Sequence, residues 1–423
     1  TEPVVDERSE GEVSLRWQWR DLPPVPRDVP AAPPLMVSPY LVWSNHPAWG
    51  DLADWYGRQV APRVRVSEQV EETALRLVNG HEDRLERINR IYRFVTNEIE
   101  DVGLEFGEHR FRPFSADWVL HHRIGACKDT AALLVALLDV SDVPARMVMI
   151  RTANLGPVGN DLAVLEIFNH AIAYLPEDDL WLDGTAAGHV VFPPPSMDQD
   201  AVALVVDGPS SSLQTTPVVG AGLSSLRYRV SDAGDGEIEL EVRSEDSGEA
   251  ADMRRARFAG SRDRERFARW LRGQFPGIQM VGEPISQVFP SRDPTLIEVK
   301  GSMTRTALAS SGGIRVFPGE LEWKASSVPG GDRHGPLMIV FKPDIEWTLD
   351  VELGRPPRNL PQSSALETPF GELRLEVDGT DSGYRVDGFL HLEPGLLTPD
   401  EVEGLRQFLV AVERRLGRKL ESP

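Results

Sequence analysis

The chain has 423 residues and one cysteine, Cys127, whose neighbours suit a nucleophile. Gly125-Ala126 precedes it and a leucine-rich helical segment follows it, so we expect Cys127 at a helix N-terminus. The partial positive charge at that end stabilises a thiolate. The backbone N–H of Cys127 would be one of the donors that a helix start leaves unpaired. The pattern therefore predicts that Cys127 supplies a thiolate from its side chain and a hydrogen-bond donor for an oxyanion from its backbone N–H.

A thiolate nucleophile needs a base, and the base needs a group that orients it. His170 falls in one predicted strand, residues 164–175, and Asp183 in the strand that returns from it. With a four-residue turn between the strands, Ile172 pairs with Asp183. His170 and Asp183 then leave the same face as diagonal neighbours. This register predicts an imidazole–carboxylate hydrogen bond that fixes the ring tautomer.

The motifs that contain these residues resemble the core of the transglutaminase-like superfamily. They are Gly125-Ala126-Cys127-Lys128-Asp129, Val143-Pro144-Ala145-Arg146, Phe168-Asn169-His170 and Leu180-Trp181-Leu182-Asp183-Gly184-Thr185, preceded by a helix around 91–99, Arg112-Pro113 and Ser115-Ala116. The resemblance covers residues 67–206 and is weaker over 36–66 and 224–423. It is most similar to bacterial proteins in which this core lies between an uncharacterised N-terminal β domain and C-terminal β-rich segments.

The resemblance implies a role for each member of the triad. Cys127 would be the nucleophile, His170 the base and Asp183 the orienting group. A second oxyanion donor would come from an upstream aromatic or amide side chain, beside the backbone N–H of Cys127. The candidates for it are Tyr92, Asn97 and Trp118. Ala126 departs from the family pattern, in which an acidic residue commonly precedes the cysteine, and this affects the electrostatics of the loop.

The elements around the triad predict an α+β fold, with a papain-like transglutaminase core followed by β-rich modules and a C-terminal helix. Ser67 is a predicted N-cap, and so is Ser115. Thr398 followed by Pro399 predicts the start of the last helix. The expected parts are an N-terminal strand, Pro-rich linker and remnant of a β domain (1–66), the transglutaminase-like core (67–206), a small strand-and-helix domain (207–320) and a β-rich domain with the C-terminal helix (321–423).

Composition bounds the partners and the compartment. The net charge of −21 disfavours nucleic acid and anionic membranes. No apolar run is long enough to span a membrane, and one cysteine cannot form an intrachain disulfide. Because the first residue is Thr1, we expect a processed or cut chain. We expect a protein or peptide substrate, and as a further partner a missing N-terminal domain or another protein. The family resemblance favours the bacterial periplasm or envelope over the cytoplasm.

Three other features have simpler interpretations, and we expect no metal and no cofactor. His121-His122 point in different directions on a helix, so a shared metal is disfavoured. The acidic turns 178–179 and 198–200 lack the spacing of a calcium loop and are expected to be solvated. A basic run is expected to be the solvent face of helices with carboxylate partners rather than an RNA site. Its members are Arg254, Arg255, Arg257, Arg262, Arg264, Arg266, Arg269 and Arg272.

The expected chemistry is attack by Cys127 on a carboxamide, loss of ammonia or an amine, and formation of a thioester. An amine acceptor would make the protein a cross-linking acyltransferase, and water would make it a protease or amidase. The alternative is a catalytically inactive scaffold that keeps the triad and binds partners through its flanking β domains. A lone cysteine without this setting would be read as a small buried apolar side chain.

Overall fold

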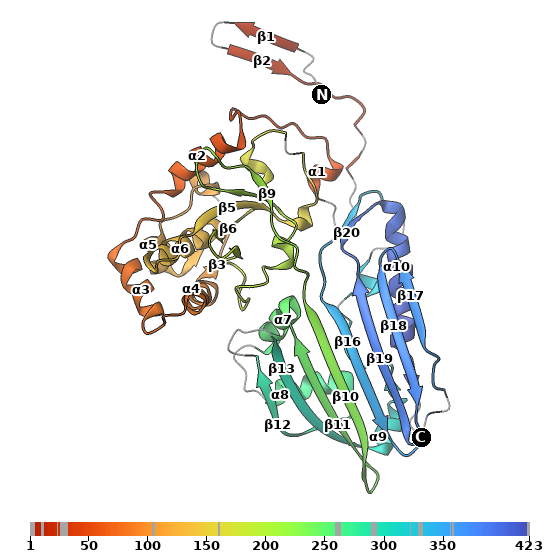
Figure 1. Cartoon of the computed structure of the whole chain (residues 1–423). Coiled ribbons are helices and arrows are strands. Elements are labelled where there is room, and N and C mark those ends of the chain that lie inside the picture. Colours follow the sequence, from red (N-terminus) through yellow and green to blue (C-terminus); the bar gives the residue numbers. More distant parts are fainter. Residues whose placement is uncertain are drawn as a thin grey trace.

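The structure is a computed structural model that describes residues 5–9, 12–22, 24–25, 33–103, 106–159, 161–258, 264–288, 294–321, 323–328, 333–355, 357 and 359–420. Figure 1 shows two large units, a helix-rich one in red to yellow and a sheet-rich one in green to blue. A small hairpin near the N-terminus lies apart from both. None of the described helices combines the length and apolar sequence needed to cross a membrane. Helix and sheet are both abundant, so the predicted α+β class is confirmed.

The helix-rich unit packs helices against one face of a five-stranded antiparallel sheet with the order β7-β6-β5-β8-β9. The buried helix α6 lies at its centre. The elements are α1 (Pro34–Val37), α2 (Trp49–Val60), α3 (Glu68–Val78), α4 (Arg84–Glu98), β3 (Glu100–Asp101), α5 (Ala116–His122), β4 (Ile124–Gly125), α6 (Cys127–Val140), β5 (Arg146–Arg151), β6 (His170–Leu175), β7 (Leu180–Leu182), β8 (Val202–Val205) and β9 (Leu213–Thr215).

Capping side chains set the helix starts of this unit. Ser67 Oγ accepts a hydrogen bond from the backbone N–H of Val70, and Ser115 Oγ accepts one from Trp118, as predicted. Asp83 caps α4 in the same way, because its side chain accepts a hydrogen bond from the backbone N–H of Glu86. Each cap supplies an acceptor to a backbone donor that the first helical turn leaves unpaired.

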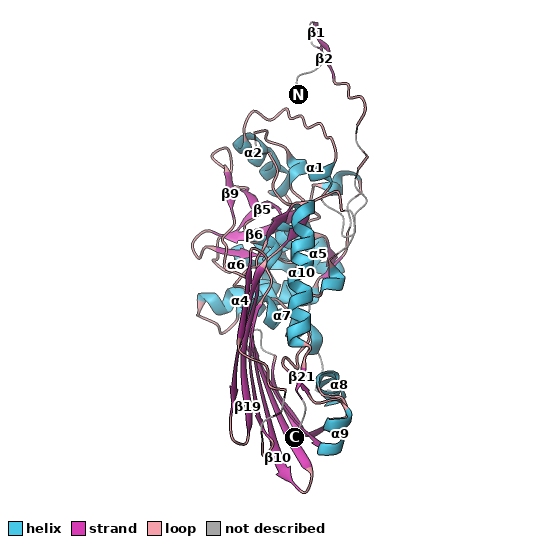
Figure 2. Cartoon of the chain, turned by 90° about the vertical axis from the view of Figure 1, so that its right-hand side faces the viewer, coloured by secondary structure: helices cyan, strands magenta, loops and turns pink. Residues whose placement is uncertain are grey.

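The sheet-rich unit is built on eight strands in the order β12-β13-β11-β10-β16-β19-β18-β17. Figure 2 shows α8 and α10 along one face of this sheet, while no helix of the described part of the chain covers the other face. The strands alternate accordingly, with Leu226, Tyr228 and Val230 buried. The elements are β10 (Leu223–Gly234), β11 (Glu237–Asp246), α7 (Gly248–Phe258), α8 (Arg264–Gln274), β12 (Gln279–Gln287), β13 (Thr295–Thr304), α9 (Arg305–Ser310), β14 (Ile314–Arg315), β15 (Leu337–Ile339), β16 (Asp344–Glu352), β17 (Ser364–Thr368), β18 (Gly371–Gly379), β19 (Gly383–Leu392), β20 (Gly395–Leu397), α10 (Pro399–Leu416) and β21 (Lys419–Leu420).

The sequence placed a domain boundary between residues 320 and 321, but the structure has one core there. β10 and β16 lie on opposite sides of that boundary and pair in parallel at the centre of the sheet. A single apolar cluster runs from Leu226 to Leu420. The parallel pair joins segments far apart in sequence, and such pairing leaves no local sequence signal.

The N-terminal segment also differs from its prediction. Residues 1–22 were expected to hold one strand, whereas β1 (Val5–Ser9) and β2 (Glu12–Arg16) form an antiparallel hairpin. Most of the predicted Pro-rich linker, residues 23–34, lies outside the described residues.

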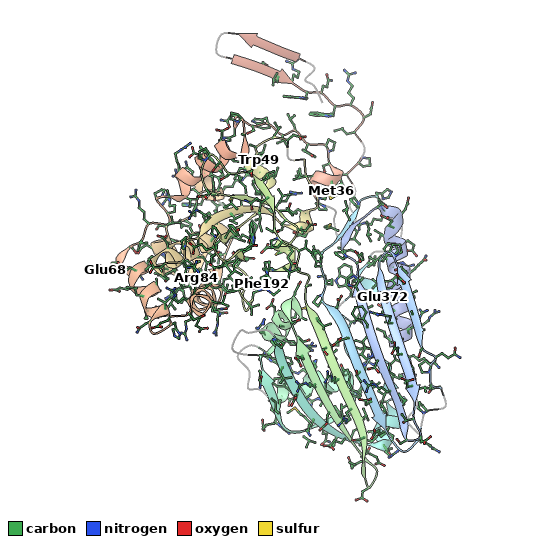
Figure 3. The ribbon with its side chains drawn as sticks, in the orientation of Figure 1. Met36, Trp49, Glu68, Arg84, Phe192 and Glu372 are labelled. Carbon is green, nitrogen blue, oxygen red and sulfur yellow. The ribbon has the colours of Figure 1, made fainter. Side chains whose placement is uncertain are left out.

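A buried ion-pair cluster joins the two units beside the triad. His189 Nε2 lies 2.6 Å from Asp252 Oδ2 of α7, and His189 Nδ1 lies 2.9 Å from the carbonyl oxygen of Val190. Arg255 pairs with the other oxygen of Asp252 at 2.5 Å. Figure 3 labels Phe192, which belongs to the same loop as His189 and lies where the helix-rich unit meets the sheet-rich unit. Burial lowers the pKa of His189, but Asp252 more than offsets it, so the net pKa is raised.

Asp252→Asn should therefore destabilise the protein in a pH-dependent way. The folded-state pKa of His189 is raised, so this stabilisation is complete below the unfolded pKa of about 6.5 and is lost as the pH rises through the folded value. Breaking the buried pair should cost about 3 kcal/mol of unfolding free energy at pH 6. Denaturant unfolding from pH 6 to pH 10 measures it, with exposed Asp235→Asn as the control. A loss independent of pH would contradict this assignment.

Candidate functional site: a buried cysteine–histidine–aspartate constellation

Cys127 is the first residue of α6, and Asp129 fixes the turn that presents it. Asp129 is buried, and its carboxylate accepts hydrogen bonds from the backbone N–H groups of Ala126 and Phe114, each at 2.8 Å. A Cβ on Gly125 would come within 2.9 Å of Asp129 Cβ, which explains the glycine. The motif around the cysteine is thus a helix cap that leaves the thiol half-buried at the positive end of α6.

His170 begins β6, and Asn169 anchors that point to the neighbouring strand. Asn169 accepts a hydrogen bond from the N–H of Thr152 at 2.9 Å and donates one to the Thr152 hydroxyl at 2.8 Å. The predicted strand over 164–175 is shorter in the structure. Its first part is the 3-10 turn Leu165–Ile167, so the strand starts at the histidine itself.

Asp183 follows β7 directly, in the predicted register. Leu175 pairs with Leu180 and Ala173 with Leu182, so the next position brings Asp183 opposite Ile172. The following glycine, Gly184, allows this loop to approach α6, because a Cβ there would lie 2.8 Å from a side-chain oxygen of that helix.

The three side chains form a connected, largely buried line. His170 Nε2 lies 3.1 Å from Asp183 Oδ2, and the side chains are 13% and 3% exposed. The Cys127 thiol interacts with the same ring, and this interaction is one of the causes that raise the pKa of His170. Because Nε2 faces Asp183, Nδ1 is the ring nitrogen left for the thiol. Asp183 Oδ1 accepts two hydrogen bonds from Thr185, from N–H at 2.8 Å and from the hydroxyl at 2.7 Å. Asp183 is thus held by Thr185 through one oxygen and faces His170 with the other.

The electrostatics of the line favour an imidazolium. Burial lowers the pKa of His170, but hydrogen bonds to Asp183 and Cys127 and the charge of Asp183 raise it to about 11. For Asp183, burial raises the pKa, and the contacts with His170 and Thr185 lower it below the ordinary value overall. An ionised aspartate beside a protonated histidine is the arrangement that stabilises a thiolate.

A fourth group, Asp198, lies behind the triad. One side-chain atom each of His170, Asp183 and Asp198 lies within 4.8 Å of the other two. The sequence placed Asp198 in a solvated acidic turn, whereas its exposure is 0%. Within the described ranges no other set of three His, Cys, Asp or Glu side chains is close enough to share an ion. His121 and His122 belong to no such set; they are exposed, with rings at 76°.

A cleft of about 260 Å³ opens beside Cys127 and His170. Tyr56, from α2, lines it with a fully buried side chain, and no described residue is a hydrogen-bond partner for the hydroxyl. Burial and the nearby Cys127 and Asp129 raise the pKa of Tyr56, so its hydroxyl keeps its proton. The remaining lining residues are Arg110, Phe111, Lys128, Met149, Leu165, Glu166, Phe168, Asn169 and Ala171.

The structure does not bring the three predicted oxyanion side chains to this cleft. Tyr92 is buried on the acidic side of the triad, where burial and then Asp183 are the largest causes that raise its pKa. Asn97 is exposed on α4. Trp118 is stacked between Phe114 and His122. Tyr56 lies outside the motifs that carry the resemblance, and its only sequence signal was an aromatic-rich segment.

The arginine run has carboxylate partners within the chain, as the sequence predicted, but Arg255 is buried and does not lie on the predicted solvent face. Five of its members form ion pairs, with Asp246, Asp252, Glu320, Glu283 and Glu265. Arg262 lies outside the described residues. A separate cavity of about 220 Å³ in the sheet-rich unit contains none of the triad residues. The cleft beside Cys127 is therefore the candidate active site.

One solved structure has a similar fold. A crystal structure from Parabacteroides distasonis, named a "putative protease", matches with a TM-score of 0.56 and 13% identity, covering 98% of this chain and 66% of that chain. The chain thus spans just under two thirds of that protein. A structure from Cytophaga hutchinsonii, named a "putative cysteine protease", matches at 21% identity over 30% of this chain and 42% of that one, with a TM-score of 0.23. A comparison with curated proteins found no match.

The family comparison covers the site. Residues 71–182 match the family model described as the transglutaminase-like superfamily. The match includes Cys127 and His170, and Asp183 is the residue that follows its end. Residues 71–182, which carry the site, are therefore similar to the core of the transglutaminase-like superfamily.

Proposed function

We propose that the protein is a cysteine acyltransferase or amidase that acts on carboxamides of proteins or peptides through a thioester on Cys127. The observation that carries the proposal is the connected line of Cys127, His170 and Asp183, of which Cys127 and His170 line a cleft of about 260 Å³. A thiol, an imidazole and an orienting carboxylate in that order are the parts that covalent acyl transfer needs.

The first step would form the thioester. The Cys127 thiolate attacks the carbonyl carbon, the C–S bond forms, and the π pair moves to oxygen. The backbone N–H of Cys127 and the hydroxyl of Tyr56, which lines the cleft, would donate hydrogen bonds to this oxyanion. When the intermediate collapses, the C–N bond breaks, and His170 gives its Nδ1 proton to the departing nitrogen. Ammonia or an amine leaves, and His170 is neutral.

The second step would resolve the thioester. Neutral His170 takes a proton from water or from an amine as that molecule attacks the thioester carbonyl. The C–S bond breaks, the thiolate returns, and Asp183 again faces an imidazolium. Water gives a carboxylic acid, and an amine gives a new amide. His170 acts as acid and then as base, which its Asp183 contact permits by fixing the ring.

The proposal is tested by trapping the acyl-enzyme. The protein is incubated with p-nitrophenyl acetate or with a glutamine peptide, with and without a primary amine, quenched in acid, and weighed intact. We expect the mass of one acyl group on Cys127, lost faster when the amine is present if the protein is a transferase. Cys127→Ala is the control. No adduct with either donor, in a protein whose thiol is accessible to alkylation, would favour the alternative of an inactive scaffold.

A further inference from the structure

Asp198 is a buried carboxyl group that the chemistry above does not use. It ends the 3-10 turn Ser196–Asp198 and is fully buried. Among the described residues, no N–H group and no hydroxyl group donates a hydrogen bond to either of its carboxyl oxygens. A buried carboxylate without donors is costly, so this group requires an explanation.

The backbone around Asp198 holds the carboxyl group in place. The N–H of Asp198 donates to the carbonyl of Pro195 at 2.9 Å, and its own carbonyl accepts from the Thr216 hydroxyl at 2.5 Å. The side chain of Gln199 makes four further hydrogen bonds at 2.7 to 3.0 Å, to Pro194, Val219 and Gly220. The chain therefore fixes Asp198 against the triad from both sides of the residue.

Only one of the two neighbouring carboxyl groups can be ionised. Two carboxylates this close in a buried site repel each other strongly, so one binds a proton. Asp183 is the ionised group of the two, because Thr185 donates two hydrogen bonds to its carboxylate and His170 faces it. Burial and the charge of Asp183 raise the pKa of Asp198 well above its ordinary value, although His170 and His189 act in the opposite direction.

We propose that Asp198 is a positioning residue, whose neutral carboxyl group donates a hydrogen bond to the Asp183 carboxylate and holds it against Nε2 of His170. The two carboxyl groups are close enough for this contact, since one side-chain atom each of His170, Asp183 and Asp198 lies within 4.8 Å of the other two. Asp183 would then have donors on both sides, Thr185 on one oxygen and Asp198 and His170 around the other. The inference rests on the proposed function, because it assigns Asp198 to the same triad.

The test uses the difference between asparagine and alanine. Asp198→Asn keeps the size of the side chain and an N–H donor toward Asp183, so kcat for p-nitrophenyl acetate should stay within about 3-fold of the parent. Asp198→Ala removes the donor and should lower kcat by about 10- to 100-fold with little change in KM, because the histidine loses its alignment. Asp183→Asn should lower kcat far more than Asp198→Asn does, since Asp183 acts as the charged acceptor. Exposed Asp200→Asn, two residues away, is the control.

Each other outcome overturns the assignment. If Asp198→Asn is as damaging as Asp183→Asn, then Asp198 carries the charge. If Asp198→Ala is as active as the parent, the residue does not position the triad. If EDTA abolishes activity and Zn²⁺ restores it with one ion per chain, the three neighbouring groups bind a metal instead. Thermal melting shows whether Asp198→Ala folds. If it does not fold, the comparison of Asp198→Asn with Asp183→Asn tests the assignment. These outcomes differ from a failure of the proposed function, because in that case the parent protein itself forms no acyl-enzyme.

Discussion

Replacement of His170 by alanine is expected to lower kcat/KM for the glutamine peptide by about 10²- to 10⁴-fold, because the departing nitrogen takes its proton from this ring. His170 also holds the positive charge beside the thiol, with its pKa raised to about 11. The parent should therefore keep the imidazolium, and with it the acid for the first step, throughout the neutral range and lose it only toward pH 11. The measurement is the pH dependence of kcat/KM from pH 5 to pH 11.

The matched control is His121→Ala, which removes an exposed ring from the nearby α5. It should leave kcat/KM within about 2-fold of the parent, because surface substitutions away from the triad and the cleft usually have small effects. Added imidazole should restore part of the activity of His170→Ala and none of that of Cys127→Ala. Equal kcat/KM in the parent and in His170→Ala would contradict the role of the histidine.

Tyr56→Phe is expected to lower kcat by about 10²- to 10³-fold, the usual cost of removing one oxyanion donor. The hydroxyl is buried beside the cleft, and no described residue accepts or donates a hydrogen bond to it. Phenylalanine preserves the ring packing in α2, so the thiol and His170 should stay in place. The loss should therefore fall on kcat, with KM changed little.

Alkylation separates this role from a structural one. Iodoacetamide reacts with a thiolate by displacement and forms no oxyanion, so Tyr56→Phe should alkylate at the parent rate while its turnover falls. Tyr174→Phe is the control, because its partly exposed hydroxyl contacts Asp179 outside the cleft. A parallel loss of alkylation and turnover would mean that Tyr56 supports the position of the thiol and not the oxyanion.

The sequence predicted the triad because local patterns determine it. Gly125 and Asp129 set the helix start that carries Cys127, and the short turn between β6 and β7 sets the register that brings Asp183 to His170. Each of these signals lies within a few residues of the group that it positions. The proximity of His170 and Asp183 and the helix start at Cys127 were therefore predictable at residue level, and their catalytic roles remain part of the proposal.

The rest depends on contacts between distant segments. Tyr56 reaches the cleft from α2, which precedes the family match, and nothing near Tyr56 in the sequence indicates the thiol. Asp198 lies in an acidic stretch of a kind that is usually solvated, and only the folded loop buries it. The single C-terminal core was missed for the same reason, since β10 and β16 pair across the predicted boundary.

The central claim is that His170 activates Cys127, and the rate of alkylation of this one thiol tests it most directly. The parent, His170→Ala and the urea-unfolded parent are treated with iodoacetamide from pH 5 to pH 9, and the single adduct is followed by intact mass. At pH 6 the parent should react at least about 10-fold faster than the other two, since a free thiol, with a pKa of about 8.5, is then almost wholly protonated. The same rate and the same pH dependence in all three samples would contradict the account.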